Sequence, residues 1–140
     1  MDRDYLEANY NLATAYDRLN QPDSAYKFYL RSIEINPNTL ANYGAYNELL
    51  KKYGMIDKGI TALLEIAKET DSPKYIYLNI ANLYSLDNTK VGKSVEYFEK
   101  AFASDPTDMM ICNHLIGLFQ KFGDVQKENY YRSLYINPQK

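Results

Sequence analysis

Residues 11–37 hold the pattern that decides the fold, NLATAYDRLNQPDSAYKFYLRSIEINP. Leu12 and Tyr16 lie one helical turn apart at the start of this stretch, which predicts an amphipathic helix. Proline is tolerated in the first turn of a helix, so Pro22 marks the start of a second one. Pro37 ends that second helix, because the residue before a proline disfavours the α region. The stretch therefore predicts a pair of helices joined by a short turn.

The same pattern recurs along the rest of the chain in three concordant series of positions. The first series lies in the first helix of each pair, at spacings of 34, 34 and 35 residues: Tyr16, Leu50, Tyr84 and Phe119. The second series lies in the second helix of each pair: Tyr29, Leu63, Phe98 and Tyr130. The third series closes each pair: Pro37, Asp71, Pro106 and Pro138. A large apolar residue stands four positions before each member of the first series: Leu12, Tyr46, Ile80 and Leu115. A turn former stands four positions after each: Asn20, Gly54, Asn88 and Gly123. The chain is therefore an internal repeat of helix pairs.

The first and last repeats also share a short self-match, in which residues 31–37 (RSIEINP) recur as residues 132–138 (RSLYINP). The match aligns Tyr29 with Tyr130 and predicts a shortened turn at Gly123-Asp124-Val125 in the last repeat.

The repeat predicts an all-α protein with one domain over residues 1–140. Four repeats are expected, over residues 4–38, 39–73, 74–107 and 108–138. Eight helices are expected, over residues 4–19, 22–35, 39–53, 56–70, 73–86, 90–104, 108–122 and 125–136. The first and second helix of each repeat are called its A helix and its B helix. No alternation typical of β-strands competes with this prediction.

Composition limits the classes of function. The net charge of −2 lacks the basic footprint of a general nucleic-acid binder. The chain contains no apolar run of eighteen residues, so no membrane insertion is expected. Its first residues lack the basic and apolar regions of a signal peptide, which leaves the cellular compartment unknown. Fifteen tyrosines and no tryptophan suit a thin structure, in which a ring is buried while its hydroxyl reaches water or a partner.

The repeat resembles the tetratricopeptide repeat. The resemblance rests on Asn11-Leu12-Ala13-Thr14-Ala15-Tyr16 and Asn79-Ile80-Ala81-Asn82-Leu83-Tyr84 in the A helices, and on the B-helix pairs Ala25 with Tyr29 and Phe98 with Ala101. Small residues at Ala13, Ala81 and Ala25 let the paired helices approach closely, while the aromatics fill the gaps. The second repeat departs from the family pattern at Asn47 and Leu50, and the fourth departs at Ile116. The resemblance implies a right-handed α-α superhelix, or solenoid, of about eight antiparallel helices.

Groups suited to catalysis are sparse. Cys112 is the only cysteine, and the sequence favours a small packed residue there over a nucleophile or metal ligand. His114 is the only histidine and lies two positions from Cys112, on a different side of the same helix. The glycines are isolated and form no phosphate-binding loop. We therefore expect a protein that is not an enzyme and that uses no cofactor and no metal.

A binding surface is the stronger prediction. Stacked helix pairs curve and form a concave groove lined mainly by the A helices. The family register predicts a peptide-binding groove with these residues: Tyr10, Asn11, Thr14, Gly44, Ala45, Glu48, Tyr75, Asn79, Asn82, Asn113 and His114. The repeated amides resemble the asparagine ladder that some tetratricopeptide proteins place on a partner's backbone, since an amide both donates and accepts. The alternative is that asparagine simply tolerates a wet helix surface.

Two other known binding modes are disfavoured. The positions that grip a chaperone's terminal carboxylate in one subclass of the family carry Tyr10, Thr14, Tyr75 and Asn79 here, so that clamp is missing. The pentatricopeptide repeat is similar in length but reads single-stranded RNA, which requires basic side chains.

The sequence therefore predicts a protein–protein interaction scaffold for a peptide or protein partner of unknown identity. The alternative is a sensory, assembly or oligomerisation segment of a larger bacterial signalling or envelope protein. Short solenoids need polar capping elements, and none follows the last predicted helix, which carries Tyr130 and Leu134. This feature favours a fragment of a longer protein, or a homo-oligomer formed through a solenoid end.

Overall fold

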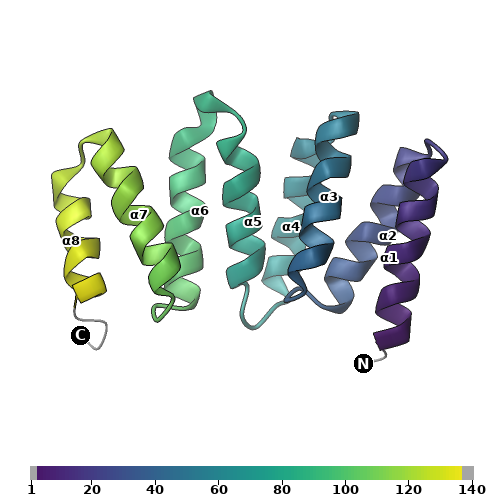
Figure 1. Ribbon diagram of the computed structural model, residues 1–140, viewed down its shortest axis with the longest axis horizontal. Coiled ribbons are helices and arrows are strands. Elements are labelled where there is room, and N and C mark those ends of the chain that lie inside the picture. Colours follow the sequence, from purple (N-terminus) through teal and green to yellow (C-terminus); the bar gives the residue numbers. More distant parts are fainter. Residues whose placement is uncertain (1–2, 137–140) are drawn as a thin grey trace. The chain divides into compact units, whose positions relative to one another are not determined.

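The computed structural model describes residues 3–136. Eight α-helices and one short 3₁₀ turn follow one another in this part of the chain (Figure 1). The helices are α1 (Arg3–Arg18), α2 (Pro22–Ile35), α3 (Leu40–Tyr53), α4 (Ile56–Lys68), α5 (Lys74–Ser85), α6 (Val91–Ser104), α7 (Met109–Phe122) and α8 (Val125–Ile136), with η1 (Asn88–Lys90) before α6. These bounds confirm the predicted all-α repeat and lie within two residues of the expected helix ends. The A helices are α1, α3, α5 and α7.

The turns between paired helices use the residues that the repeat predicted at these places. Gly54 and Gly123 have φ angles of 67° and 73°, and Asn20 has a φ angle of 56°. These three residues occupy the left-handed region, which glycine and asparagine enter at the lowest cost. The third repeat differs, because Asn88 begins the 3₁₀ turn η1 and the Asp87 carboxylate accepts a hydrogen bond from the Thr89 backbone at 2.9 Å. The spacing of 35 residues from Tyr84 to Phe119 is one residue longer than the two earlier spacings, and this turn accommodates the extra residue.

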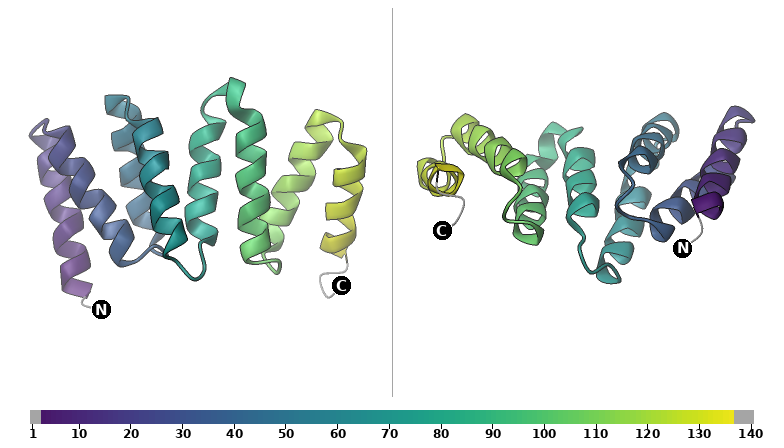
Figure 2. Two further views of the ribbon diagram at one scale, coloured as in Figure 1. Left: turned by 180° about the vertical axis from the view of Figure 1, so that it is seen from behind. Right: turned by 60° about the horizontal axis from the view of Figure 1, so that its bottom comes forward.

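The chain divides into two compact units, Met1–Asp71 with α1 to α4 and Ser72–Lys140 with α5 to α8. Each unit therefore contains two repeats. Within them, the helices of one pair lie side by side and run in opposite directions (Figures 1 and 2). The single domain and the right-handed superhelix stay predictions.

A stack of two rings joins the A helix to the B helix in three of the four repeats. Tyr16 stacks on Phe28 with ring centroids 5.6 Å apart and planes 3° from parallel. In the third repeat, Tyr84 stacks on Tyr97 at 5.7 Å and 26°. The fourth repeat has the stack at 5.7 Å and 4°, between Phe119 and Tyr131. The first series of the sequence pattern therefore marks one half of a recurring ring stack.

The second repeat closes its helix pair without aromatic stacking at this place. Leu50 replaces the aromatic residue on α3, and Gly59 on α4 lies opposite it. A Cβ atom on Gly59 would lie 2.3 Å from Leu50 Cδ1, so a larger residue there would force the Leu50 side chain to shift. The Tyr46 hydroxyl also donates a hydrogen bond to the Gly59 carbonyl at 3.1 Å. The predicted departure at Leu50 is thus matched by a smaller residue across the interface.

The structure corrects the predicted register of the last helix. The sequence aligned Tyr130 with Tyr29, but in the structure Tyr131 takes the place that Phe28 has in the ring stack of the first repeat. Tyr131 is only 6% exposed, whereas Tyr130 is 58% exposed. The separation of Phe119 and Tyr131 equals that of Tyr16 and Phe28, so the turn at Gly123-Asp124-Val125 is not shortened. Burial of a ring against Phe119 sets the rotation of α8, and the short self-match does not. Pro138 and the end of that match lie outside the described residues.

Leu12 also differs from the other members of its series. Tyr46, Ile80 and Leu115 are fully buried, but Leu12 is 43% exposed. No described helix covers this side of α1, which leaves Leu12 in contact with solvent.

Candidate functional site

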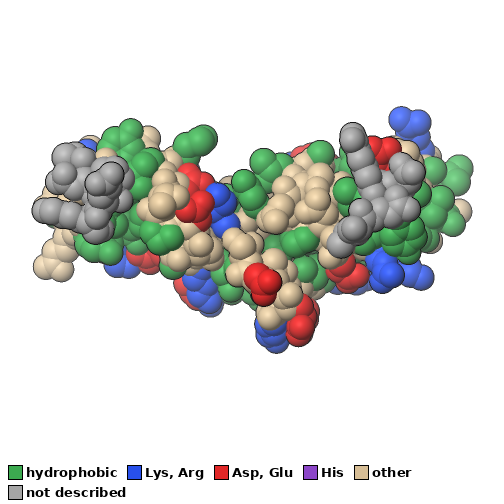
Figure 3. Space-filling view, turned by 90° about the horizontal axis from the view of Figure 1, so that it is seen from below, with side chains coloured by type: hydrophobic (Ala, Val, Ile, Leu, Met, Phe, Trp, Pro, Cys, Tyr) green, Lys and Arg blue, Asp and Glu red, His purple; other side chains and the backbone are tan. Residues whose placement is uncertain are grey.

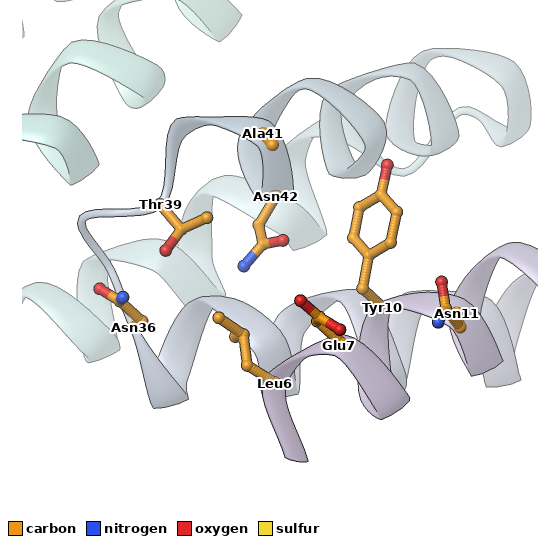
Figure 4. Close-up of a pocket in the computed structure, with 8 residues that line it drawn as sticks. All are labelled: Leu6, Glu7, Tyr10, Asn11, Asn36, Thr39, Ala41 and Asn42. Carbon is orange, nitrogen blue, oxygen red and sulfur yellow. The ribbon is translucent and has the colours of Figure 1, made fainter. Parts of the chain in front are cut away.

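A hollow lies between the first turns of α1 and α3 in the N-terminal unit, on the side where the groove was predicted (Figure 4). Its volume is about 490 Å³. The helix α1 contributes Leu6, Glu7, Tyr10 and Asn11 to its lining, and the loop before α3 with the first turn of α3 contributes Asn36, Thr39, Ala41 and Asn42. Tyr10 and Asn11 of the predicted groove are therefore brought together at one hollow.

The position of Tyr10 is fixed from inside the first repeat. Its ring meets the Tyr29 ring edge-on at a centroid distance of 5.6 Å. The Thr14 hydroxyl donates to the Tyr10 carbonyl at 3.1 Å and lies 3.1 Å from the Tyr29 hydroxyl. Burial raises the pKa of Tyr29, so this hydroxyl keeps its proton and its hydrogen bond at neutral pH. Thr14 thus acts on the hollow by holding the tyrosines beside it.

The remaining predicted residues of this unit lie further along α3. Gly44 is exposed, and a Cβ atom placed on it would meet no atom within 4 Å. Ala45 is half-buried, while Glu48 is exposed and forms an ion pair with Lys51. This part of α3 is therefore open and nearly bare, although it does not line the hollow.

Asn42 is the feature of the hollow that the sequence analysis missed. It is 4% exposed, and among the described residues its amide nitrogen Nδ2 finds no hydrogen-bond acceptor. The signal was available in the sequence, because Asn42 shares an apolar helix face with Tyr46 and Leu49. The family register could not reveal it, since the register identifies exposed groove positions and Asn42 is not one of them.

One acidic side chain lies among the described residues that line the hollow. Glu7 is exposed at the rim, and the described lining residues include no lysine or arginine. Figure 4 shows Glu7 and Tyr10 projecting from α1 toward α3. The lining of the hollow is therefore mainly apolar, with Leu6 and Ala41 on its two sides, and it carries the Glu7 carboxylate and several amide and hydroxyl groups.

The predicted groove residues of the C-terminal unit differ in exposure. Tyr75 is half-buried, with the Lys74 ammonium 4.9 Å from its ring centre. Asn82 and Asn113 are exposed on α5 and α7. Asn79, in contrast, is only 6% exposed. The predicted amide series is thus divided between surface positions and one interior position.

The two groups considered for catalysis are both engaged in packing. The Cys112 thiol is buried, donates to the Tyr131 carbonyl at 3.3 Å, and has its pKa raised by burial. His114 is exposed, but its ring lies 4.4 Å from the Phe98 ring, and partial desolvation there lowers its pKa. Both residues therefore join α7 to a neighbouring helix of the same unit.

On the face shown in Figure 3, acidic and basic side chains lie interspersed outside the region covered in grey. In the described part of the chain, several acidic and basic residues form ion pairs within one helix, such as Lys68 with Glu65 at 2.8 Å. Between residues 3 and 136, no helix combines the length and the apolar content that crossing a bilayer requires.

Helix pairs joined by one recurring ring stack define a helical-repeat protein, a class that presents extended binding surfaces. The family model of the tetratricopeptide repeat matches residues 6–39, and a second tetratricopeptide model matches residues 75–108. The chain is therefore a tetratricopeptide-repeat protein. Such repeats generally serve as scaffolds for protein–protein interaction. No curated protein sequence matches the chain.

Solved structures of two proteins illustrate the shared fold. PilF of Pseudomonas aeruginosa is 18% identical with a TM-score of 0.58, over 94% of this chain and 60% of PilF. MamA is 14% identical with a TM-score of 0.60, over 94% of this chain and 76% of MamA. The structure of MamA from residue 41 to its end, from Desulfovibrio magneticus RS-1, is 17% identical with a TM-score of 0.57, over 94% of this chain and 73% of that chain. At these identities the likeness concerns the fold alone. The chain spans only 60% of PilF.

Proposed function

We propose that this chain is a scaffold that binds an extended segment of a partner protein against the exposed side chains of its A helices. The hollow between α1 and α3 carries the proposal, because it offers concave surface on the A-helix side of a tetratricopeptide unit. The bare surface around Gly44 leaves space beside it for a partner's side chain. Asn11, Asn82 and Asn113 supply exposed amides that match a peptide backbone.

The interaction is expected to be modest in strength and spread over several contacts. A neutral hydrogen bond contributes only about 0.5–1.5 kcal/mol, because it replaces a bond to water. A surface of scattered amides therefore binds through their sum, and it recognises backbone more than any one side chain.

Binding without catalysis is the second part of the proposal. The burial of Cys112 and the packing of His114 support it, since both groups already have a structural role. A scaffold acts by holding its partner and requires no reactive group.

Assembly with further copies, or within a larger signalling or envelope protein, is the second candidate function. Exposed apolar side chains favour it: Leu12 and Leu19 lie open on or beside α1, and Val125 and Tyr130 lie open on α8. Apolar surface of this kind is removed from water when a protein partner covers it.

Site-specific photo-crosslinking in the native host distinguishes these functions. The photoreactive residue p-benzoylphenylalanine replaces Asn11 or Asn113 on the A helices, Lys27 or Gln126 on the B helices, or Leu12 on the open side of α1. The scaffold proposal predicts a crosslinked partner from Asn11 and Asn113 and none from Lys27 and Gln126. Crosslinks from the B helices alone would refute it. Crosslinks from Leu12 to the chain itself would favour assembly.

A further inference from the structure

The side chain of Asn42 is an unusual feature of the interior of this protein. The other buried polar side chains of the described residues have partners. Ser32 donates to the Phe28 carbonyl at 3.2 Å, and Ser94 donates to the Ala81 carbonyl at 2.9 Å. Asn42 is as deeply buried, yet its Nδ2 has no acceptor among the described residues. A buried donor without a partner destabilises the free protein, so its presence needs an explanation.

The repeat shows that an amide is not required at this position for folding. Eight residues before each member of the Tyr16 series, the four repeats carry Ala8, Asn42, Ile76 and Ile111. Ile76 and Ile111 are both buried. An apolar residue therefore serves the packing of the A helix at the equivalent place, and the amide of Asn42 is particular to the second repeat.

The amide nitrogen points into the hollow between α1 and α3. In Figure 4, Asn42 extends from α3 with its nitrogen directed toward the space above Leu6 and Glu7. The terminal torsion of asparagine is broad, so a small rotation presents Nδ2 to a group that enters this space. The direction and the missing acceptor together indicate that the acceptor comes from another molecule.

The lining limits the chemistry of that acceptor. An acceptor oxygen is needed, and a phosphate or carboxylate in this hollow would approach the like-charged carboxylate of Glu7. A neutral carbonyl meets no such repulsion. The apolar surfaces of Leu6 and Tyr10 adjoin the amide and suit an aliphatic side chain next to that carbonyl.

We infer that Asn42 donates a hydrogen bond to a main-chain carbonyl of the bound partner, at a segment where an aliphatic residue is flanked by basic residues. The aliphatic side chain lies against Leu6 and Tyr10, and the basic side chains benefit from the negative charge of Glu7. The inference rests on the proposed scaffold function and specifies the sequence class that its hollow takes.

Three blocked tetrapeptides test the inference: acetyl-KLKG-amide, acetyl-ELEG-amide and acetyl-KGKG-amide. They are titrated into ¹⁵N-labelled protein, and the Asn42 side-chain N–H resonances are followed by NMR. The first peptide is expected to shift these resonances and to bind about two- to five-fold more tightly than the second, the range that an exposed charge supports. The third is expected to bind more weakly than the first, because it lacks the aliphatic side chain.

Variants separate recognition from folding. Asn42→Leu keeps the branched shape and removes the unpaired donor, so it should raise the melting temperature. It should also weaken the binding of the first peptide by about two- to ten-fold, the value of one hydrogen bond. Glu7→Gln should remove the preference of the protein for acetyl-KLKG-amide over acetyl-ELEG-amide. The control Asn129→Leu removes an exposed amide on α8 and should leave peptide binding unchanged.

Two results would overturn the inference. In the first, Asn42→Leu lowers the melting temperature and leaves peptide binding intact, which makes the amide structural. In the second, the peptides leave the Asn42 resonances unmoved. The scaffold function fails separately, through B-helix crosslinks, so the hollow can be refuted while the scaffold stands.

Discussion

Asn9 and Asn79 show how single polar residues divide between structure and surface. The Asn9 amide donates to the Tyr5 carbonyl at 2.8 Å, one turn earlier in the same helix. Asn79 was predicted as a groove residue but is buried on α5, so its replacement is expected to affect folding before binding. Asn11, at the equivalent position in the first repeat, is exposed. Equal positions in the repeat thus differ in burial, because each depends on what packs against it.

The same reasoning shows which parts of the site the sequence could predict. Tyr10 and Asn11 followed from the repeat register, although the register does not fix burial, since Asn79 at the position of Asn11 is buried. Asn42 did not follow, because a missing hydrogen-bond acceptor is a property of the folded neighbourhood. An asparagine on an apolar face was the only sequence signal for it.

A pH prediction belongs to Asp105. Hydrogen bonds from the Lys74 ammonium at 2.8 Å and from Thr107 lower the pKa of Asp105 to about 2. A carboxyl whose folded pKa is depressed contributes stability that is present above its ordinary pKa and is lost as the pH falls toward the depressed value. The melting-temperature difference between wild type and Asp105→Asn should therefore shrink as the pH is lowered from about 4 to about 2. When Lys74 is first replaced by Met, the further replacement Asp105→Asn should change the melting temperature less at every pH. A melting-temperature difference between wild type and Asp105→Asn that stays constant with pH would contradict the assignment.

At the scale of helices, local chemistry predicted most boundaries correctly. Gly54 and Gly123 adopt left-handed conformations that end α3 and α7, as turn formers at those positions predict. Pro22 begins α2. The predicted rotation of α8 about its axis was wrong. Two tyrosines are adjacent in this short helix, and its own sequence does not indicate which of the two rings faces the core. The position of Tyr131 depends on Phe119, which lies in another helix.

Replacing each of the two adjacent tyrosines of α8 tests this correction. Tyr131 stacks on Phe119, meets Phe102 edge-on at 5.6 Å, and donates to Glu99 at 2.9 Å. Tyr131→Ala should therefore lower the free energy of unfolding by about 3–5 kcal/mol, as for other buried aromatic truncations. Tyr130→Ala should cost less than about 1 kcal/mol, because that ring is largely exposed. Urea unfolding followed by circular dichroism gives both values, and the reverse order would restore the register of the self-match.

At the scale of the whole chain, each compact unit presents its own pair of A helices. The N-terminal unit offers a hollow and a bare stretch of α3, while the C-terminal unit offers Asn82 and Asn113. A partner that uses both units gains from the sum of weak contacts, because linked sites raise the effective concentration of each other. The proposed scaffold function therefore predicts that each unit contributes its own contacts to an extended segment of the partner.

The most direct test of the scaffold function is the affinity of the crosslinked partner, measured by isothermal titration calorimetry with two matched double variants. Asn11→Ala with Asn113→Ala removes one exposed amide from an A helix of each unit. Lys27→Ala with Gln126→Ala removes one exposed polar side chain from a B helix of each unit. The A-helix variant should bind about ten-fold more weakly, the value of two neutral hydrogen bonds, with an unchanged melting temperature. The B-helix variant should bind as the wild type does. Weakened binding of the B-helix variant, together with wild-type affinity of the A-helix variant, would contradict the account.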